Sequence, residues 1–145
     1  MLTPKLVTLN KPIQSGMVVL DLAKVIFFHG YYQQLKVVFP GGISMLYMDT
    51  DSAVILVNDP QRTFLQDLAK HKQFFDFSKL PKDHEIFREH EQLLETRVVN
   101  AGVSGLWKLE SIDVQQITTI KSKQYSILYF DQAEELKCKG VTYAA

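Results

Sequence analysis

Two short apolar segments separated by an acidic tip constrain the fold of this chain most strongly. Residues 45–48 and 53–57 are apolar, and the sequence between them is Asp-Thr-Asp-Ser. Runs of this length, the second rich in β-branched residues, predict two buried strands joined by a tight polar turn. Because side chains alternate along a strand, we expect Asp49 and Asp51 to point the same way and Thr50 to point away. Two carboxylates aimed at one place repel each other, and a divalent ion bound by oxygen ligands is the usual way to relieve that repulsion.

An ordinary turn is the alternative interpretation of this tip. Asp, Ser and Thr are common turn formers, because their side chains hydrogen-bond to the nearby backbone. A two-residue hairpin, however, usually carries Gly or Asn at its tip, and this one brings two acids together instead. Such a local conflict between sequence and expected structure is typical of a functional site.

Length, charge and hydropathy limit the class of protein. At 145 residues the chain is one domain's worth and can bury a core. Lys plus Arg and Asp plus Glu both number 16, and zero formal net charge argues against a strongly basic nucleic-acid-binding protein while leaving local basic stripes open. The apolar stretches predict no segment long enough to span a bilayer, so we expect no membrane association. The first residues lack a signal-peptide layout, so a nuclear, cytosolic or virion-associated protein is expected rather than a secreted one.

Cysteine and histidine patterns limit redox and metal chemistry. Cys138 is the single cysteine, which excludes an internal disulfide and suits a reducing compartment. His71, His84 and His90 lack the spacing of a zinc site. We therefore expect ordinary surface or core histidines.

A long helix is expected before the hairpin. Residues 1–15 predict an extended lead-in, and the helix is predicted from Met17 to about Val38, where Pro40-Gly41-Gly42 ends it. Its apolar stripe comprises Val18, Leu22, Val25, Ile26 and His29. Apolar residues also lie outside this stripe, so we expect the helix to be covered on more than one side.

The rest of the chain predicts a short helix and further strands. The short helix is expected over residues 61–72, and strands over residues 109–120 and 124–130. Residues 73–92 are expected to be an irregular surface loop pinned to the core by phenylalanines, and residues 93–104 fit neither pattern clearly. No internal repeat or domain boundary interrupts the sequence.

The acidic tip and several other segments resemble one family. Tyr47-Met48-Asp49-Thr50-Asp51-Ser52 resembles the Tyr-x-Asp-Thr-Asp-Ser motif in the palm domain of family B DNA polymerases. Further segments, in the family's order, are similar to its protein-primed branch, which includes viral and self-synthesising-transposon enzymes. These segments are Lys11-Pro12-Ile13, Gly16 with residues 20–24, Phe75-Asp76-Phe77-Ser78 with Pro81-Lys82-Asp83-His84, residues 105–110, Lys123-Gln124-Tyr125-Ser126, and residues 137–141.

The resemblance implies a metal-dependent catalytic site. Asp49 and Asp51 would be the catalytic carboxylates and would bind two Mg²⁺ or Mn²⁺ ions, about 3.5–4 Å apart in such sites. Tyr47, Thr50 and Ser52 would shape that site. The implied reaction is template-directed nucleotidyl transfer to a primer 3′-hydroxyl.

The resemblance also implies DNA contacts. Lys121, Lys123 and Tyr125 would bind the primer, with lysine at a phosphate and the tyrosine ring against sugar or base. An exposed strand lysine beside a half-buried tyrosine is the ordinary alternative for Lys123 and Tyr125. The implied partners are primer–template DNA, deoxynucleoside triphosphates, and a terminal protein or the missing N-terminal part of a polymerase.

Several family features are missing from the sequence. A third acid is expected from an Asp-x-x-Ser-Leu-Tyr-Pro segment, and the triphosphate grip from a finger-helix lysine and an Asn-Ser-x-Tyr-Gly stretch; neither segment is present. Leu109 also stands where the family has Asp. We therefore expect residues 1–145 to form a single partial palm domain, with a thumb beginning after about residue 120, that cannot polymerise alone.

The expected fold is α+β: an antiparallel palm-type sheet with a catalytic hairpin, flanked by one long and one short helix. Two alternatives remain for function. The first is a non-catalytic remnant that binds DNA or a protein. The second is a metal-dependent glycosyltransferase with an Asp-x-Asp motif, although such an enzyme is expected to have helices alternating with strands before the motif.

Overall fold

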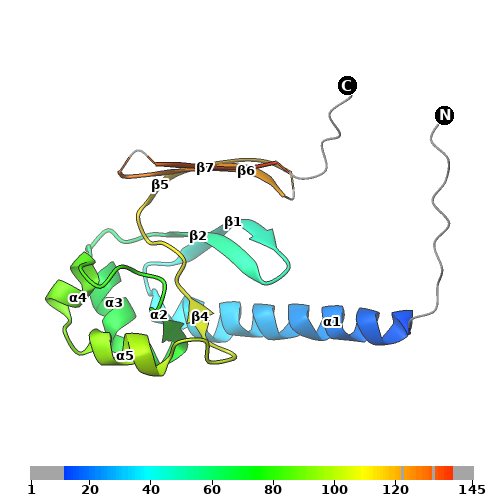
Figure 1. Ribbon diagram of the computed structural model, residues 1–145, viewed down its shortest axis with the longest axis horizontal. Coiled ribbons are helices and arrows are strands. Elements are labelled where there is room, and N and C mark those ends of the chain that lie inside the picture. The colour runs from blue at the N-terminus through cyan, green and yellow to red at the C-terminus, as the bar shows by residue number, and fades with distance from the viewer. Residues whose placement is uncertain (1–11, 122, 132, 139–145) are drawn as a thin grey trace.

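The computed structural model describes residues 12–121, 123–131 and 133–138, which form a mixed α+β fold, as expected (Figure 1). The strands form three separate sheets: the antiparallel hairpin β1–β2, a short parallel pair β3–β4, and the antiparallel sheet β5–β6–β7. The elements are α1 (Ile13–Gly30), η1 (Tyr31–Leu35), α2 (Lys36–Val38), β1 (Ile43–Asp49), β2 (Ser52–Val57), α3 (Phe64–Lys70), η2 (Lys72–Phe74), β3 (Phe75–Asp76), α4 (Glu85–Glu89), α5 (Leu93–Val99), β4 (Trp107–Lys108), β5 (Val114–Lys121), β6 (Gln124–Tyr129) and β7 (Glu134–Cys138).

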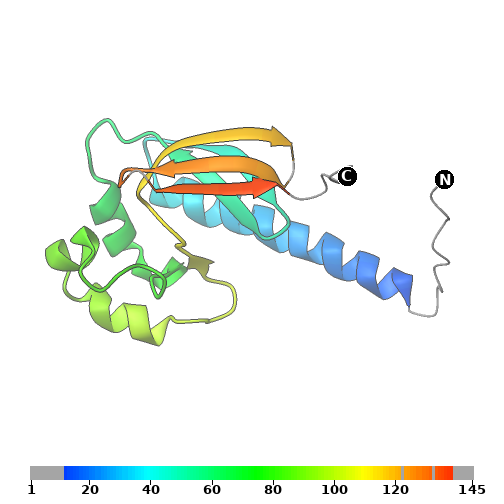
Figure 2. The same cartoon turned by 45° about the horizontal axis from the view of Figure 1, so that its top comes forward.

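The elements lie in layers. Figure 1 shows the hairpin β1–β2 between α1 below it and the sheet β5–β6–β7 above it. The short helices α3, α4 and α5 gather at one end, and Figure 2 shows the three-stranded sheet crossing over the hairpin. The fold therefore carries several short helices rather than one, and its strands are split among sheets rather than joined in a single one.

The long helix begins earlier than predicted. It starts at Ile13, directly after Pro12, and continues through the π-helical turn η1 to Val38. The prediction of a start at Met17 was wrong because Pro12 suits a helix N-terminus, where its missing N–H leaves no hydrogen bond unmade. The predicted end at Val38 is confirmed. The extended lead-in falls mostly on residues 1–11, which lie outside the described residues, as does the tail segment from Lys139.

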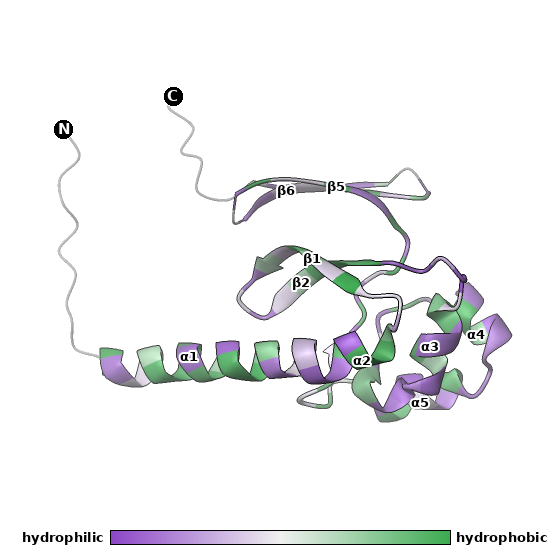
Figure 3. Cartoon of the chain, turned by 180° about the vertical axis from the view of Figure 1, so that it is seen from behind, coloured by the Kyte–Doolittle hydropathy of each residue, from purple (hydrophilic) through white to green (hydrophobic). Residues whose placement is uncertain are grey.

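The first turns of α1 are uncovered. Leu22 is 55% exposed and Ile26 is 68% exposed, and Val18 and Val25 are similarly open. Figure 3 shows apolar residues along the length of this helix. The expectation that the helix would be covered on more than one side is wrong for these turns within the described chain.

The 26-residue helix 13–38 is also long and apolar enough to cross a membrane, contrary to the expectation from sequence. Length and composition do not distinguish such a span from a helix buried in a larger protein.

The core lies at the other end of this helix. Its members are buried side chains from η1, α2, the residue after α2, α3 and the segment 75–93: Tyr31, Leu35, Val38, Phe39, Leu68, Phe75, Phe77, Leu80, Ile86, Phe87 and Leu93. Residues 73–92 were expected to be a surface loop, yet they supply much of this core and contain η2, β3 and α4. These elements are five residues long or shorter, too short to show a helical or strand period in sequence.

The predicted short helix and the two predicted strands are present with shifted ends, whereas α5 and β4 were not predicted. The short helix runs over Phe64–Lys70, and Asp59 accepts hydrogen bonds from the backbone N–H groups of Thr63 and Phe64 at its start. Strand β5 begins at Val114 rather than residue 109, and β6 ends at Tyr129. Strand β7 was not predicted.

Candidate functional site

The hairpin tip is a two-residue turn. Asp49 pairs with Ser52 as the last pair of the ladder, so Thr50 and Asp51 form the turn, with Thr50 at φ 60°. The N–H of Asp51 donates to the carbonyl of Asp49 (2.7 Å), and the Ser52 hydroxyl donates to the same carbonyl (3.2 Å). The prediction that Asp49 and Asp51 share one side assumed a continuous strand. The turn at Thr50 interrupts that alternation, so the reasoning does not apply.

The turn between β5 and β6 meets this hairpin. The backbone N–H of Lys123 donates to the hydroxyl of Tyr47 at 2.7 Å, across a sequence separation of 76 residues. The Lys123 ammonium lies 3.6 Å from the Asp49 carboxylate. The rings of Tyr47 and Tyr125 lie 5.0 Å apart between centroids, tilted by 59°. Three contacts therefore join two sheets between which the described residues form no strand pairing.

A small cavity lies at this junction. It measures about 150 Å³ and is lined by Tyr47, Asp49, Ser52, Lys123, Tyr125 and Lys137. Lys137 enters from β7, where it pairs with Tyr125 of β6, so both residues lie on the same face of the sheet. The lining carries two ammonium groups and one carboxylate, which favours a ligand with negative charge. The two tyrosine rings offer faces against which a sugar or base can lie.

Most of the predicted site residues meet here. The cavity is lined by Tyr47, Asp49 and Ser52 of the hairpin and by Lys123 and Tyr125, which lie far from the hairpin in the sequence. The other predicted residues do not line it: Thr50 and Asp51 lie in the exposed turn, and Lys121 is exposed at the end of β5. Lys137 is a lining residue that sequence reasoning did not assign to the site. The pairing of Lys137 with Tyr125 places it at the cavity, but that pairing could be inferred only if β7 had been predicted.

The described acids do not by themselves fit a two-metal site. No cluster of three or more His, Cys, Asp or Glu residues that could hold a metal ion occurs in the part of the chain that the structure describes. Asp49 is paired with Lys123, and Asp51 is not among the cavity residues. Binding two divalent ions would require at least one further acid beside Asp49. The predicted Mg²⁺ or Mn²⁺ site remains a prediction.

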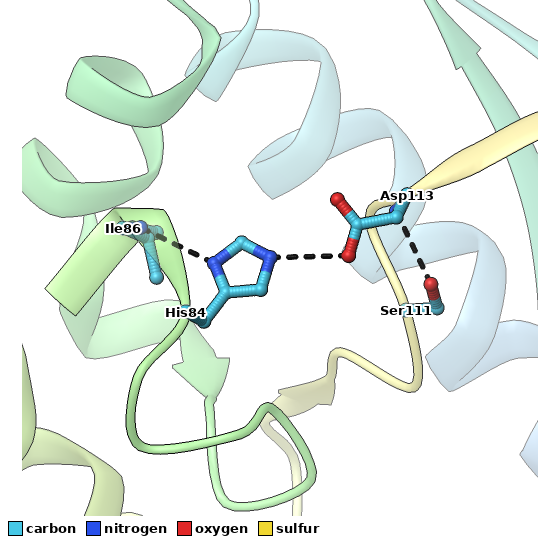
Figure 4. Close-up of polar contacts among 4 residues, drawn as sticks. All are labelled: His84, Ile86, Ser111 and Asp113. Carbon is cyan, nitrogen blue, oxygen red and sulfur yellow. Dashed lines mark hydrogen bonds and ion pairs between the residues drawn. The ribbon is translucent and has the colours of Figure 1, made fainter. Parts of the chain in front are cut away.

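A second polar cluster braces the fold away from this cavity (Figure 4). The Ile86 N–H donates to Nδ1 of His84 at 3.2 Å, which caps α4. Since Nδ1 accepts, the neutral ring carries its proton on Nε2 and donates it to Asp113, also at 3.2 Å. The Asp113 N–H in turn donates to the Ser111 hydroxyl. His84 therefore ties α4 to the segment before β5, a structural role.

No protein-family model, curated protein or solved structure matches this chain. The function is therefore inferred from the cavity and from the motif resemblance.

Proposed function

We propose that this chain is part of the palm of a family B DNA polymerase, of the protein-primed branch, and that its cavity binds the end of a DNA strand. The observation that carries this proposal is the meeting of the two resembling motifs. The Tyr-x-Asp-Thr-Asp-Ser hairpin and the Lys-x-Tyr turn contact each other through Tyr47, Asp49, Lys123 and Tyr125. The resemblance assigns these residues to one site, and they line one cavity.

The cavity chemistry supports binding of a nucleic acid strand. A lysine ammonium is a natural partner for a phosphate, and Lys123 reaches the cavity from a turn whose backbone is held by Tyr47. The paired rings of Tyr47 and Tyr125 suit a sugar or base, because stacking on aromatic rings tolerates every base. We therefore propose that the ligand is a single DNA strand. In a polymerase this strand would be the primer, bound by its end.

Catalysis by the chain alone is not expected. Two divalent ions supply the charge stabilisation of nucleotidyl transfer when they are bound. Asp49 provides one carboxylate at the cavity, and its present partner is the Lys123 ammonium. We propose that the described residues bind and orient the strand, while further acids complete the metal site.

The Asp49–Lys123 pair also favours a second candidate, a palm remnant that binds DNA without any metal. In that case Asp49 competes with the phosphate for Lys123, and removing the carboxylate frees a cation for the phosphate. An exposed ion pair is worth about 0.2–1 kcal/mol, so the gain in affinity would be at most about fivefold.

The experiment is DNA binding by Asp49→Asn, measured by fluorescence anisotropy with a labelled single strand in EDTA and again in Mg²⁺. Asp83→Asn, an exposed acid outside the cavity, is the matched control. We expect the wild type to bind in EDTA and Lys123→Ala to weaken binding. Tighter binding by Asp49→Asn in EDTA supports the second candidate, in which Asp49 competes with the phosphate for Lys123, and weaker binding confined to Mg²⁺ supports a metal role.

Two results would each overturn one part of the proposal, the first the strand binding and the second the incompleteness of the metal site. Absence of DNA binding by the wild type at low salt would remove the strand-binding function. Primer extension by the purified chain, abolished by Asp49→Asn, would show that the site is complete and that the expected incompleteness is wrong.

A further inference from the structure

A row of polar side chains on the three-stranded sheet leads to the cavity. The Tyr129 hydroxyl donates to one oxygen of the Glu135 carboxylate at 3.0 Å. The other oxygen lies 2.8 Å from the Lys137 ammonium. That ammonium lies 5.6 Å from the centroid of the Tyr125 ring, at the edge of the cavity. The strand register places these side chains on one face of β6 and β7.

We propose that Lys137 is a second phosphate-binding residue of the cavity and that Glu135, fixed by Tyr129, is the residue that positions it. This inference rests on the proposed function, because it assigns a role within the same strand-binding cavity. Lys137 is one of the lining residues, whereas Glu135 and Tyr129 are not. They act through Lys137 rather than on the ligand.

The hydrogen bonds explain how the position is held. Both oxygens of Glu135 are engaged, one by Tyr129 and one by Lys137. A lysine ammonium has three donors, so the bond to Glu135 leaves donors for a ligand. The Lys137 side chain is 52% exposed and would otherwise sample many rotamers. Fixing it before binding reduces the entropy that the ligand has to overcome.

The charge state of the pair is stable. The hydrogen bonds to Glu135 and to Tyr125 raise the pKa of Lys137. The hydrogen bond from Lys137, followed by that from Tyr129, lowers the pKa of Glu135 against the opposing effect of burial. Lys137 is therefore a cation, and Glu135 an anion, throughout the range in which DNA binding would be measured.

The test is the salt dependence of single-strand binding. The affinity of the full chain for a labelled single strand is measured in EDTA between 50 and 200 mM KCl. For single strands, each phosphate contact contributes about 0.7 to the slope of log affinity against log salt. We expect Lys137→Ala to reduce that slope by about 0.7 and the affinity at 50 mM by roughly three- to tenfold. Lys137→Arg should restore the slope, because the guanidinium also binds phosphate.

Tyr129→Phe tests the positioning role without changing any charge. It removes the hydrogen bond to Glu135, so we expect about a twofold weaker affinity with an unchanged slope. Lys82→Ala is the control for charge, because Lys82 is exposed and does not line the cavity. Its slope should match the wild type. Circular dichroism melts establish that each variant is folded.

Each failure has a distinct meaning. An unchanged slope in Lys137→Ala, with a reduced slope in Lys123→Ala, would overturn this inference and leave the proposed function intact. Wild-type affinity in Tyr129→Phe would overturn the positioning role of Glu135. Unchanged slopes in both lysine variants would overturn the proposed function as well.

Discussion

Asp76 is a buried carboxylate whose removal gives a direct test of the fold. Its side chain is 2% exposed. One oxygen accepts from the Ser78 N–H at 2.8 Å and the other from the Gly102 N–H at 3.0 Å. The latter bond fixes the loop between α5 and β4 against β3. The carboxylate thus pairs two backbone donors that have no other partner among the bonds of the described residues.

We expect Asp76→Ala to destabilise the protein by about 3–5 kcal/mol. A hydrogen bond to a charged group contributes about 1.5–3 kcal/mol, and this substitution removes two such bonds, both partly buried. Asp76→Asn keeps one acceptor oxygen and turns an amide N–H₂ toward the other donor, so about half that loss is expected. A domain is stable by about 5–15 kcal/mol, so the alanine variant should still fold.

Urea unfolding followed by circular dichroism measures the effect, with Asp83→Ala as the control at an exposed acid. With a urea slope of about 2 kcal/mol per molar, the midpoint should fall by roughly 2 M in Asp76→Ala and by little in the control. Equal midpoints for Asp76→Ala and the wild type at pH 7 would refute the reasoning, because the two donors would then have to be solvated.

The same variant should show a defined pH dependence. Burial acts to raise the pKa of Asp76, but the hydrogen bonds from Gly102 and Ser78 and the charge of Lys108 outweigh it, so the pKa is lowered. A lowered pKa contributes stability that is present above the unfolded value of about 3.9 and is lost as the pH falls through the folded value. The difference between wild type and Asp76→Ala should therefore be full at pH 7 and shrink below about pH 4. A difference that stayed constant to pH 2 would contradict the assignment of the charge.

Two further substitutions test the contacts that join the elements. Tyr47→Phe removes the acceptor for the Lys123 N–H but keeps the ring contact with Tyr125, so single-strand affinity in the anisotropy assay should fall roughly two- to tenfold; unchanged affinity would mean that the hydroxyl does not hold the turn. His84→Ala removes the cap of α4 and the bond to Asp113, and urea unfolding should show a loss of about 1–2 kcal/mol; a midpoint equal to that of the wild type would show that water replaces the cap.

The hairpin was the most predictable part of the fold. Apolar runs on both sides of a polar tip locate β1 and β2 to within two residues, but the expectation of buried strands was wrong, because every residue of both strands is half-buried or exposed. The segment 75–93 was the least predictable, because its helices and strands are short and their phenylalanines are buried by contacts distant in sequence. Strand β7 was missed because Glu-Glu-Leu-Lys-Cys has only two apolar residues, too few to predict a strand, and is ordered by its ladder with β6.

The site was predictable in part, and for different reasons. The residues 47–52 stand out from local pattern alone, whereas the association of Lys123 and Tyr125 with them was predicted only through the family resemblance. Local spacing cannot reveal a contact across 76 residues. The expectation for Asp51 failed because a turn, rather than a strand, follows Asp49. Lys137 required the register of an unpredicted strand.

Zero net charge argues against a strongly basic nucleic-acid-binding protein, and the ion pairs of the cavity are compatible with the strand binding that we propose. Each cavity lysine has an acidic partner: Lys123 has Asp49, and Lys137 has Glu135. These acidic partners hold the lysine side chains in place and balance their charge locally. Strand binding of the kind proposed would therefore not require a large basic surface. A phosphate must then compete with a carboxylate for each ammonium, which limits both the electrostatic part of the affinity and its dependence on salt. No carboxylate competes with a base for stacking on the rings of Tyr47 and Tyr125. Stacking should therefore supply a larger share of the binding energy than it does on a strongly basic surface. A cavity built in this way would select a strand end placed against Tyr47 and Tyr125 over the uniform backbone of a duplex.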